Sequence, residues 1–332
     1  MSYGRFLLKR GFQGILVVWG VVSIVFMLRF ITPGSPVDAV APLDASAELR
    51  QRIAEELGLN QPLYVQYLDY LWALLHGDMG YSYISGIEAS QMVFTKLPAT
   101  VELAVASSLV AITLSIPLGV ISATRRHQPA DYAATTFSLV GISTPNFWLG
   151  IMLVLLLSVE FGLFPTSGRA YGFIEAFRIL AAQGVSPGLD ALWQWLRHIF
   201  LPAVTLGTYF TALITRLTRS GMLEELGQSY VQATRAKGLP ESLIRYKHAL
   251  RNTLIPVITV LGLQLGTLIG GAVITEAVFS WPGLGTTLIN AINVRDWPIL
   301  QATLVVIGCG FVLVNLVVDA VYAYLDPQVV AE

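Results

Sequence analysis

The residues of this chain that could do chemistry are few and lie far apart. The chain has four histidines and one cysteine, namely His76, His127, His198, His248 and Cys309. These numbers argue against a metal site built from His and Cys and against an internal disulfide. The sequence also lacks a Gly-x-x-x-x-Gly-Lys-Ser/Thr phosphate loop, a His-Glu-x-x-His zinc helix and a Gly-x-Ser-x-Gly elbow. We therefore expect no catalytic residue, no bound metal and no ATP hydrolysis in this chain.

One polar segment, residues 219–252, carries the most specific pattern. Good helix-forming sequence runs to Lys237, Gly238 is a helix stop, and Pro240 followed by Glu241 is a helix start. The pattern predicts two short helices joined by a tight turn, a unit rigid enough to transmit a push. The alternative is a basic loop that only sets topology and touches lipid headgroups.

The composition predicts that the chain is a membrane protein, so that membrane-spanning helices hold this polar segment in place. Hydrophobic residues make up 55% of the 332 residues and charged residues 12%, whereas a soluble domain has about 25% charged residues. A soluble chain of this length would form about two domains, and too few ionic groups are present to cover the surfaces of two such domains. The net charge of −1 also argues against nucleic acid as a partner.

Six stretches are apolar over about the 20 residues that a spanning helix needs. They are residues 11–31, 103–124, 132–159, 198–215, 252–275 and 297–318. The first could instead be a cleaved secretory signal, because Ala39-Val40-Ala41 resembles a cleavage site. Its apolar run is longer than a signal core and Pro42 would follow the cut, so we expect an uncleaved anchor.

Lys and Arg in short loops predict the orientation. They gather in residues 5–10, 125–126 and 216–251, whereas acidic residues dominate 38–88. With six crossings, the basic segments lie on one side, which places both termini in the cytoplasm.

The acidic segment, residues 33–99, is too polar to span and too long for a turn. Asp44 or Ser46 could cap a helix that ends at Gly58, and Pro62 could start a second helix that reaches Leu75. We expect an extracytoplasmic helical insertion that caps the bundle; a direct role in receiving substrate or a partner is the alternative. The segment 161–197 is nearly balanced in charge, and its sequence indicates neither a structure nor a role.

Within the spans, a few residues are candidates for the transport path or for helix packing. Pro145 interrupts the third span, and with Asn146 and Gln264 it is a candidate for a hinge or for the lining of a path. Small residues recur every fourth position in the fifth span, where they permit close helix approach; they are Gly262, Gly266 and Gly270.

The charged groups near the spans argue against ion coupling. Glu102, Glu276 and Asp319 lie near predicted span ends, so we expect them at the interface, and no buried pair of opposite charges is evident. This pattern disfavours a proton-coupled secondary transporter. A membrane-embedded enzyme is disfavoured by the scarcity of nucleophiles and metal ligands.

The polar segment also carries a family resemblance. Gln232-Ala233-Thr234 with Gly238 resembles the Glu-Ala-Ala-x-x-x-Gly loop of the membrane subunits of ABC importers, with Gln232 in place of the acidic residue. Ala236-Lys237-Gly238-Leu239 and residues 248–252 resemble its form in the dipeptide/oligopeptide/nickel permease family. Further similar stretches are residues 33–36, where Ser35 replaces the more usual Asp, and 77–82, 97–100, 143–148, 276–285 and 324–327; the last two resemble the first of the family's two permease subunits.

This resemblance implies an all-α membrane protein with the type I ABC importer permease fold. It implies a translocation path for di- or oligopeptides, with nickel chelates, glutathione or oligosaccharides as alternative cargo. The implied partners are a second permease subunit, two ATPase subunits that bind ATP and Mg²⁺, an extracytoplasmic binding protein and the cell membrane of a prokaryote. The implied ATPase coupling residues are Gln232, Ala233, Thr234, Ala236, Lys237, Gly238 and Leu239.

The expected organisation has four parts. Residues 1–32 form the cytoplasmic start and first span, and 33–99 form the extracytoplasmic helical segment. Residues 100–325 form the five-helix core with the coupling loop 219–252, and 326–332 form a tail.

Overall fold

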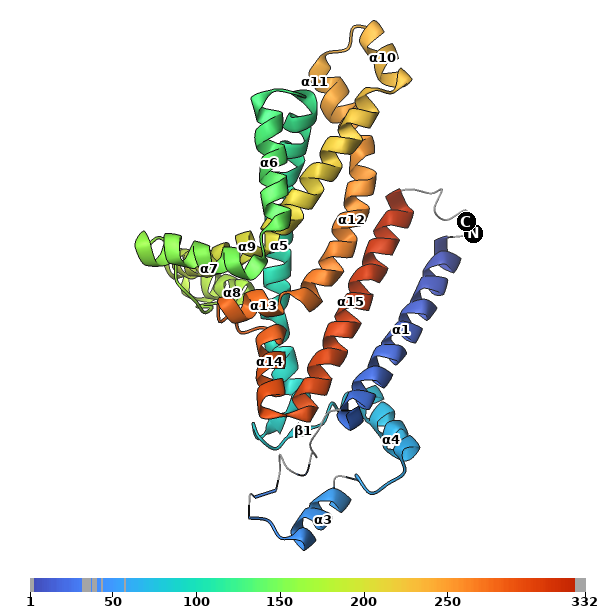
Figure 1. Cartoon of the computed structure of the whole chain (residues 1–332), viewed down its shortest axis with the longest axis vertical. Helices are drawn as coiled ribbons and strands as arrows, with labels where there is room; N and C mark the ends of the chain where they lie inside the picture. Colours follow the sequence, from blue (N-terminus) through green and yellow to red (C-terminus); the bar gives the residue numbers. More distant parts are fainter. Residues whose placement is uncertain (1–2, 32–36, 38–40, 43, 57, 326–332) are drawn as a thin grey trace.

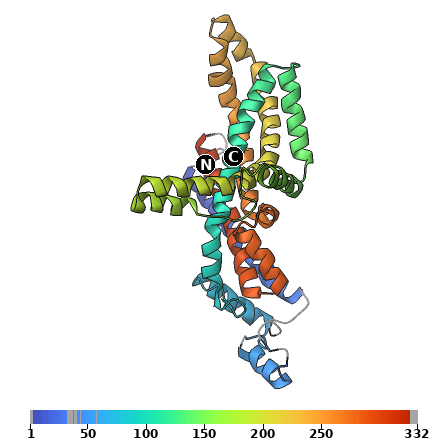
Figure 2. The same cartoon turned by 90° about the vertical axis from the view of Figure 1, so that its left-hand side faces the viewer.

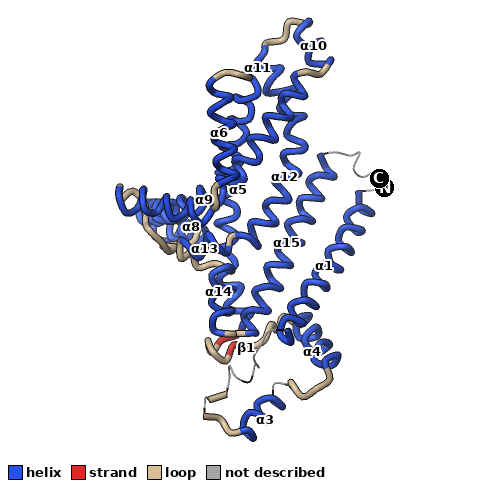
Figure 3. Tube along the Cα trace, in the orientation of Figure 1, coloured by secondary structure: helices blue, strands red, loops and turns tan. Residues whose placement is uncertain are grey.

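The computed structural model describes residues 3–31, 37, 41–42, 44–56 and 58–325, and these are almost entirely helical (Figures 1 and 3). Long helices run side by side along the longest axis of the molecule, with small helical units at its two ends (Figure 1). The described residues form one sheet, a two-stranded antiparallel hairpin of β1 (Tyr81–Ser82) and β2 (Ile87–Glu88).

Four single helices are long and apolar enough to cross a membrane: α1 (Tyr3–Ile31), α5 (Ala89–Thr124), α9 (Val185–Leu226) and α15 (Trp297–Leu325). Two bent pairs pass the same test when their parts are joined. One pair is α6 (Pro129–Ser143) with α7 (Asn146–Leu153) and its π-helical continuation η1 (Val154–Glu160); the other runs from residue 241 into α12 (Leu250–Gly271). The predicted six spans are reached when each bent pair counts as one.

The third predicted span, residues 132–159, is broken at Pro145, where the sequence analysis placed an interruption. The two halves of this pair are bent by 107°. Thr144 and Pro145 have extended backbone, with ψ of 123° and 131°, because a residue before proline avoids the helical region and proline supplies no N–H to continue the ladder. The chain therefore turns sideways, and α7, η1, α8 (Phe173–Gln183) and the first part of α9 form a lateral arm (Figures 1 and 2).

The fourth span was also misjudged, since α9 is the longest helix of the described residues, at 42 residues, rather than the shortest. Charged residues at both of its ends interrupt the apolar run without interrupting the helix. Its contact with α5 is the largest helix interface, and Gly207 and Gly119 permit it. A Cβ on Gly207 would lie 2.8 Å from the Ser107 carbonyl oxygen, and one on Gly119 would lie 2.5 Å from Thr218 Cβ.

At one end of the molecule, the segment between α1 and α5 forms α3 (Ala47–Glu56), α4 (Leu63–Leu75) and the β hairpin. The predicted helix signals are confirmed, because Ser46 Oγ accepts a hydrogen bond from the backbone of α3, Gly58 has φ +68° and Pro62 precedes α4. The apolar side of α4 packs on α1, where the Tyr67 hydroxyl lies 2.6 Å from Ser23 Oγ.

At the opposite end, α10 (Ser229–Ala236), α11 (Glu241–Leu243) and the π-helical turn η2 (Ile244–Ala249) form a projecting hairpin (Figure 1). The start of α1 and the end of α15 lie toward this end of the molecule. Two shorter helices, α13 (Val273–Val278) and α14 (Leu284–Val294), connect α12 to α15.

Candidate functional site

The projecting hairpin, residues 228–249, follows from its local sequence. α10 ends in a Schellman motif, in which the Gly238 N–H bonds the Arg235 carbonyl at 2.9 Å and the Leu239 N–H bonds the Thr234 carbonyl at 3.3 Å. Gly238 has φ +76°, the left-handed conformation that glycine adopts without steric cost. Pro240 then precedes α11, as predicted. The sequence therefore fixes both the end of the first helix and the start of the second.

Charge pairs and a small apolar core join the two arms of the hairpin. Arg235 Nε donates to Glu241 Oε1 at 2.7 Å, and Arg245 Nε lies 3.4 Å from Glu241 Oε2. Val231 on α10 and Ile244 on η2 are completely buried. These exposed charge pairs are individually weak, so the buried aliphatic contacts and the Schellman bonds give the hairpin most of its rigidity.

The base of the hairpin is tied to both helices that carry it. The Tyr230 hydroxyl donates to the Glu225 carboxylate near the end of α9, and Asn252 Nδ2 at the start of α12 donates to both at 3.1 Å. Partial burial and the adjacent carboxylate raise the pKa of Tyr230 to about 12, so the phenol stays protonated as a donor. A force on α10 is thereby directed to α9 and α12 together.

The hairpin gathers all the residues predicted to contact an ATPase. Most of them lie on its exposed surface: Gln232, Ala233, Ala236, Lys237 and Gly238. Thr234 and Leu239 are half-buried, and Thr234 Oγ1 bonds the Val231 carbonyl at 2.7 Å. Beside the hairpin lies a cavity of about 510 Å³ whose lining includes Lys247, His248 and Arg251. This end of the molecule therefore presents an exposed, basic surface on a rigid hairpin.

The residues predicted to line a path are not brought together into one site. Pro145 and Asn146 lie at the bend between α6 and α7. Gln264 lies on α12, where its Oε1 accepts a hydrogen bond from Thr267 Oγ1 at 3.1 Å. Within the described chain, no hydrogen bond joins Asn146 to Gln264.

The glycines of α12 face α15. A Cβ on Gly262 would lie 2.1 Å from Val318 Cγ1, and one on Gly266 would lie 3.1 Å from the Phe311 ring. These two positions leave no room for a larger residue without movement of α15. The surroundings of Gly270 lie outside the described residues.

The prediction that Glu276 is interfacial is wrong. Its side chain is fully buried, and its carboxylate accepts hydrogen bonds from Thr100 Oγ1 at 2.6 Å and from the Thr286 N–H at 3.1 Å. A Cβ on Gly283 would lie 2.2 Å from Glu276 Oε1. The carboxylate thus fastens α13 and α14 to α5. The sequence carries a signal for it in the glycines at 283 and 285, which clear space beside the carboxylate.

The interfacial prediction is also wrong for Glu102, whose side chain is 13% exposed. Arg169 Nη2 donates to its carboxylate at 2.8 Å, and the Phe173 N–H and Trp195 Nε1 donate at 2.9 and 3.3 Å. This carboxylate therefore ties the lateral arm to α5. Asp319 is partly exposed and pairs with Arg10 at 3.3 Å.

The sequence analysis also missed an ion pair whose carboxylate is buried and whose arginine side chain is 29% exposed. Asp131 at the start of α6 is 3% exposed and forms a two-bond pair with Arg219 of α9, at 2.8 and 3.0 Å. Ser122 Oγ and the His127 N–H donate to the same carboxylate. The pair lies near the hairpin end and joins α5, α6 and α9. The sequence analysis missed it because the partners are 88 residues apart.

Among the described residues, no group of three or more His, Cys, Asp or Glu side chains could hold a metal ion.

Comparison with known proteins identifies the family. The model of the binding-protein-dependent transport system inner membrane component matches residues 115–331, and the N-terminal model of the same kind of membrane component matches residues 3–104. The chain belongs to this family. It is therefore a multi-pass membrane protein and a transport component rather than an enzyme.

Members of known name align with the chain over nearly its full length. The dipeptide transport system permease protein DppB of Escherichia coli K12 is 39% identical over 333 residues, covering 98% of each chain. The oligopeptide transport system permease protein AppB of Bacillus subtilis is 37% identical with the same coverage. The di/tripeptide transport system permease protein DppB of Pseudomonas aeruginosa is 41% identical over 94% of each chain.

A solved structure shows the same fold. A chain of the MetNI methionine ABC transporter in inward-facing form aligns with a TM-score of 0.52 and 18% identity, over 71% of this chain and 97% of its own. The predicted type I ABC permease fold is confirmed. Family membership implies partners of the general kinds found in ABC importers: another permease, ATPases and a binding protein.

Proposed function

We propose that this chain is a permease subunit of an ABC importer for di- or oligopeptides, and that it forms the translocation path together with a second, different permease subunit. The identity of 37–41% to the three peptide permeases over almost the whole chain carries this proposal. The cargo arrives from an external binding protein, and ATP with Mg²⁺ is bound by two separate ATPase subunits.

The hairpin end of the molecule faces the cytoplasm in this proposal. The basic residues of the hairpin and of the cavity beside it support the orientation, since Lys and Arg concentrate in cytoplasmic loops. The start of α1 and the end of α15 lie toward the hairpin end of the molecule. In this proposal both termini are therefore in the cytoplasm, and α3, α4 and the β hairpin are outside. The membrane is that of a prokaryotic cell.

In this proposal the hairpin acts as a lever that transmits movement of an ATPase subunit to the membrane-spanning helices. An ATPase that binds α10 and moves displaces the whole hairpin as a rigid unit, because the hairpin has its own buried contacts and a Schellman turn. The Glu225–Tyr230–Asn252 hydrogen bonds pass the displacement to α9 and α12. α9 in turn packs along α5, so a movement at the hairpin changes the packing of the central helices. The exposed residues Gln232, Ala233, Ala236, Lys237 and Gly238 make the contact, with Thr234 and Leu239 behind them.

Uptake by the assembled transporter tests the proposal. The complex of this chain, its second permease, the ATPases and the binding protein is reconstituted in vesicles, and radiolabelled dialanine is supplied on the binding-protein side. We expect uphill uptake that needs ATP hydrolysis and stops with a non-hydrolysable analogue. Uphill uptake by vesicles that contain this chain alone would contradict the proposal, as would a complex that moves a nickel chelate or an oligosaccharide but no peptide.

A further inference from the structure

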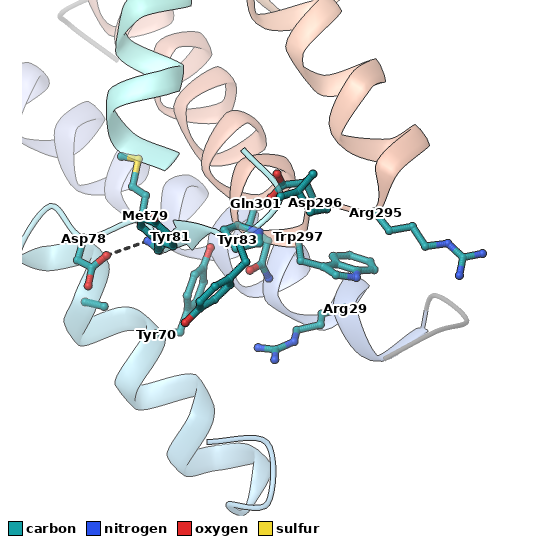
Figure 4. Close-up of a pocket in the computed structure, with 14 residues that line it drawn as sticks. Arg29, Tyr70, Asp78, Met79, Tyr81, Tyr83, Arg295, Asp296, Trp297 and Gln301 are labelled. Carbon is teal, nitrogen blue, oxygen red and sulfur yellow. Dashed lines mark hydrogen bonds between the residues drawn. The ribbon is translucent and has the colours of Figure 1, made fainter. Parts of the chain in front are cut away.

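A cavity of about 270 Å³ lies at the α4 end of the molecule, where the end of α1 and the start of α15 meet α4 and the loop before β1 (Figure 4). Its charged and aromatic lining residues include Arg29, Tyr70, Asp78, Tyr83, Arg295 and Trp297. The proposed lever and the buried carboxylates described above do not involve this cavity.

The loop that forms one wall is held firmly in place. Gly77 and Gly80 have φ of +82° and +91°, which lets the chain turn tightly. Asp78 Oδ1 accepts a hydrogen bond from the Gly80 N–H at 2.8 Å (Figure 4). Ser82 Oγ donates to the buried Asp296 carboxylate at the start of α15. The wall is therefore preformed, and its position relative to α15 is fixed.

Opposite charges lie on different sides of this cavity. In Figure 4, Asp78 lies on one side and Arg29 on the other, with Tyr70 and Tyr83 between them in this view. The second oxygen of Asp78 has no partner among the described residues, and Asp78 is exposed. No described carboxylate lies within 4.0 Å of the Arg29 or Arg295 guanidinium. The Tyr70 hydroxyl is buried and lacks a hydrogen-bond partner in the described part of the chain.

The cavity lies at the level where α1 ends and α15 begins. Arg29 is two residues before the end of α1, and Trp297 is the first residue of α15. Arg, Tyr and Trp are typical of the headgroup region of a bilayer. The neighbouring ends of α1 and α4 are strongly apolar and exposed, since Ile31 is 75% and Leu75 is 81% exposed. A ligand that reaches the cavity from the membrane therefore meets an apolar surface beside a charged pocket.

We propose that this cavity binds the headgroup of a phospholipid that carries both a phosphate and a primary ammonium, as phosphatidylethanolamine does. Arg29 donates to the phosphate, the free oxygen of Asp78 accepts from the ammonium, and the acyl chains lie against the apolar end of α1. Asp78 disfavours a purely anionic headgroup such as that of phosphatidylglycerol, and a quaternary choline offers it no N–H donor. The bound lipid fills the space between α1, α4 and α15.

Lipid retention tests the proposal without reference to transport. The assembled complex is purified from vesicles with equal amounts of phosphatidylethanolamine and phosphatidylglycerol, and retained lipids are counted by native mass spectrometry. We expect the wild type to retain phosphatidylethanolamine selectively. Arg29→Gln removes a charge-assisted bond and should lower this retention about tenfold. Asp78→Asn should abolish the preference over phosphatidylglycerol while a lipid is still bound.

Matched variants on the same part of the chain control for nonspecific effects of charge. Arg52→Gln on α3 and Asp69→Asn on α4 change exposed side chains outside the cavity and should leave retention unchanged. Retention by Arg29→Gln equal to that of the wild type would overturn the proposal, as would an Asp78→Asn variant with an unchanged headgroup preference. Displacement of the lipid by excess dialanine or inorganic phosphate would overturn it too, because the cavity would then take a solute from solution.

Discussion

Replacement of Gly238 by alanine gives the sharpest test of the hairpin geometry. The residue has φ +76°, and no neighbouring atom lies within 4 Å of the position that a Cβ would take. The substitution therefore meets no steric contact, and its cost is the left-handed backbone alone, about 1–2 kcal/mol for a residue with a Cβ. Asparagine tolerates this conformation better, so Gly238→Asn should cost less.

Hydrogen exchange measures this cost directly. A loss of 1–2 kcal/mol multiplies local opening by roughly 5–30-fold, so the amides of α10 and α11 should exchange faster by that factor in Gly238→Ala and by less in Gly238→Asn. Peptide uptake by the reconstituted complex should fall in the same order, with membrane insertion unchanged. Gly162→Ala is the matched control, because Gly162 has φ +61° and equally open surroundings but lies outside the hairpin. Equal exchange in wild type and Gly238→Ala would refute the reasoning, and so would loss of uptake in Gly162→Ala.

Three further predictions address the packing and the polar contacts. Glu276→Ala leaves the buried Thr100 hydroxyl and Thr286 N–H without their acceptor, which should cost about 1–3 kcal/mol and lower the melting temperature of the purified complex, whereas the exposed Glu224→Ala should not; equal melting of both variants would contradict the role of Glu276. Gly262→Ala places a Cβ against Val318 and should destabilise by about 1–3 kcal/mol, with recovery in the double variant Gly262→Ala, Val318→Ala; failure of the second change to restore the melting temperature would argue against this contact. The raised pKa of Tyr230 means that its stabilising hydrogen bond is present below pH 10 and is lost as the pH rises through about 12, so the phenolate difference spectrum of wild type minus Tyr230→Phe should show its midpoint near pH 12, and a midpoint near 10 would contradict the bond to Glu225.

Local signals in the sequence predicted much of the structure. Gly238, Pro240, Ser46 and Pro62 each mark a helix boundary that the structure contains, because capping and turn chemistry depend on a few adjacent residues. The apolar stretches located the spans, because the required length is set by the thickness of the bilayer.

Contacts between distant residues could not be predicted in the same way. The break at Pro145 was visible in the sequence, but its angle of 107° depends on what α7 packs against. Glu276 and Glu102 were misjudged because a charged residue near a span end looks interfacial until its partners are known, and the Asp131–Arg219 pair was missed because its partners are 88 residues apart. Charged residues at the ends of α9 likewise hid its length, since hydropathy measures transfer into lipid and not helix continuity.

Crosslinking from the hairpin tests most directly the claim that a separate ATPase drives this permease through it. A benzophenone probe is attached to Ala233→Cys in a Cys309→Ser background, and the assembled complex is irradiated. Ala233 is exposed on α10, so the account predicts a crosslink to an ATPase subunit, and none from the same probe on Tyr83→Cys at the other end of the molecule. A crosslink to the ATPase from Tyr83→Cys, with none from Ala233→Cys, would contradict the account.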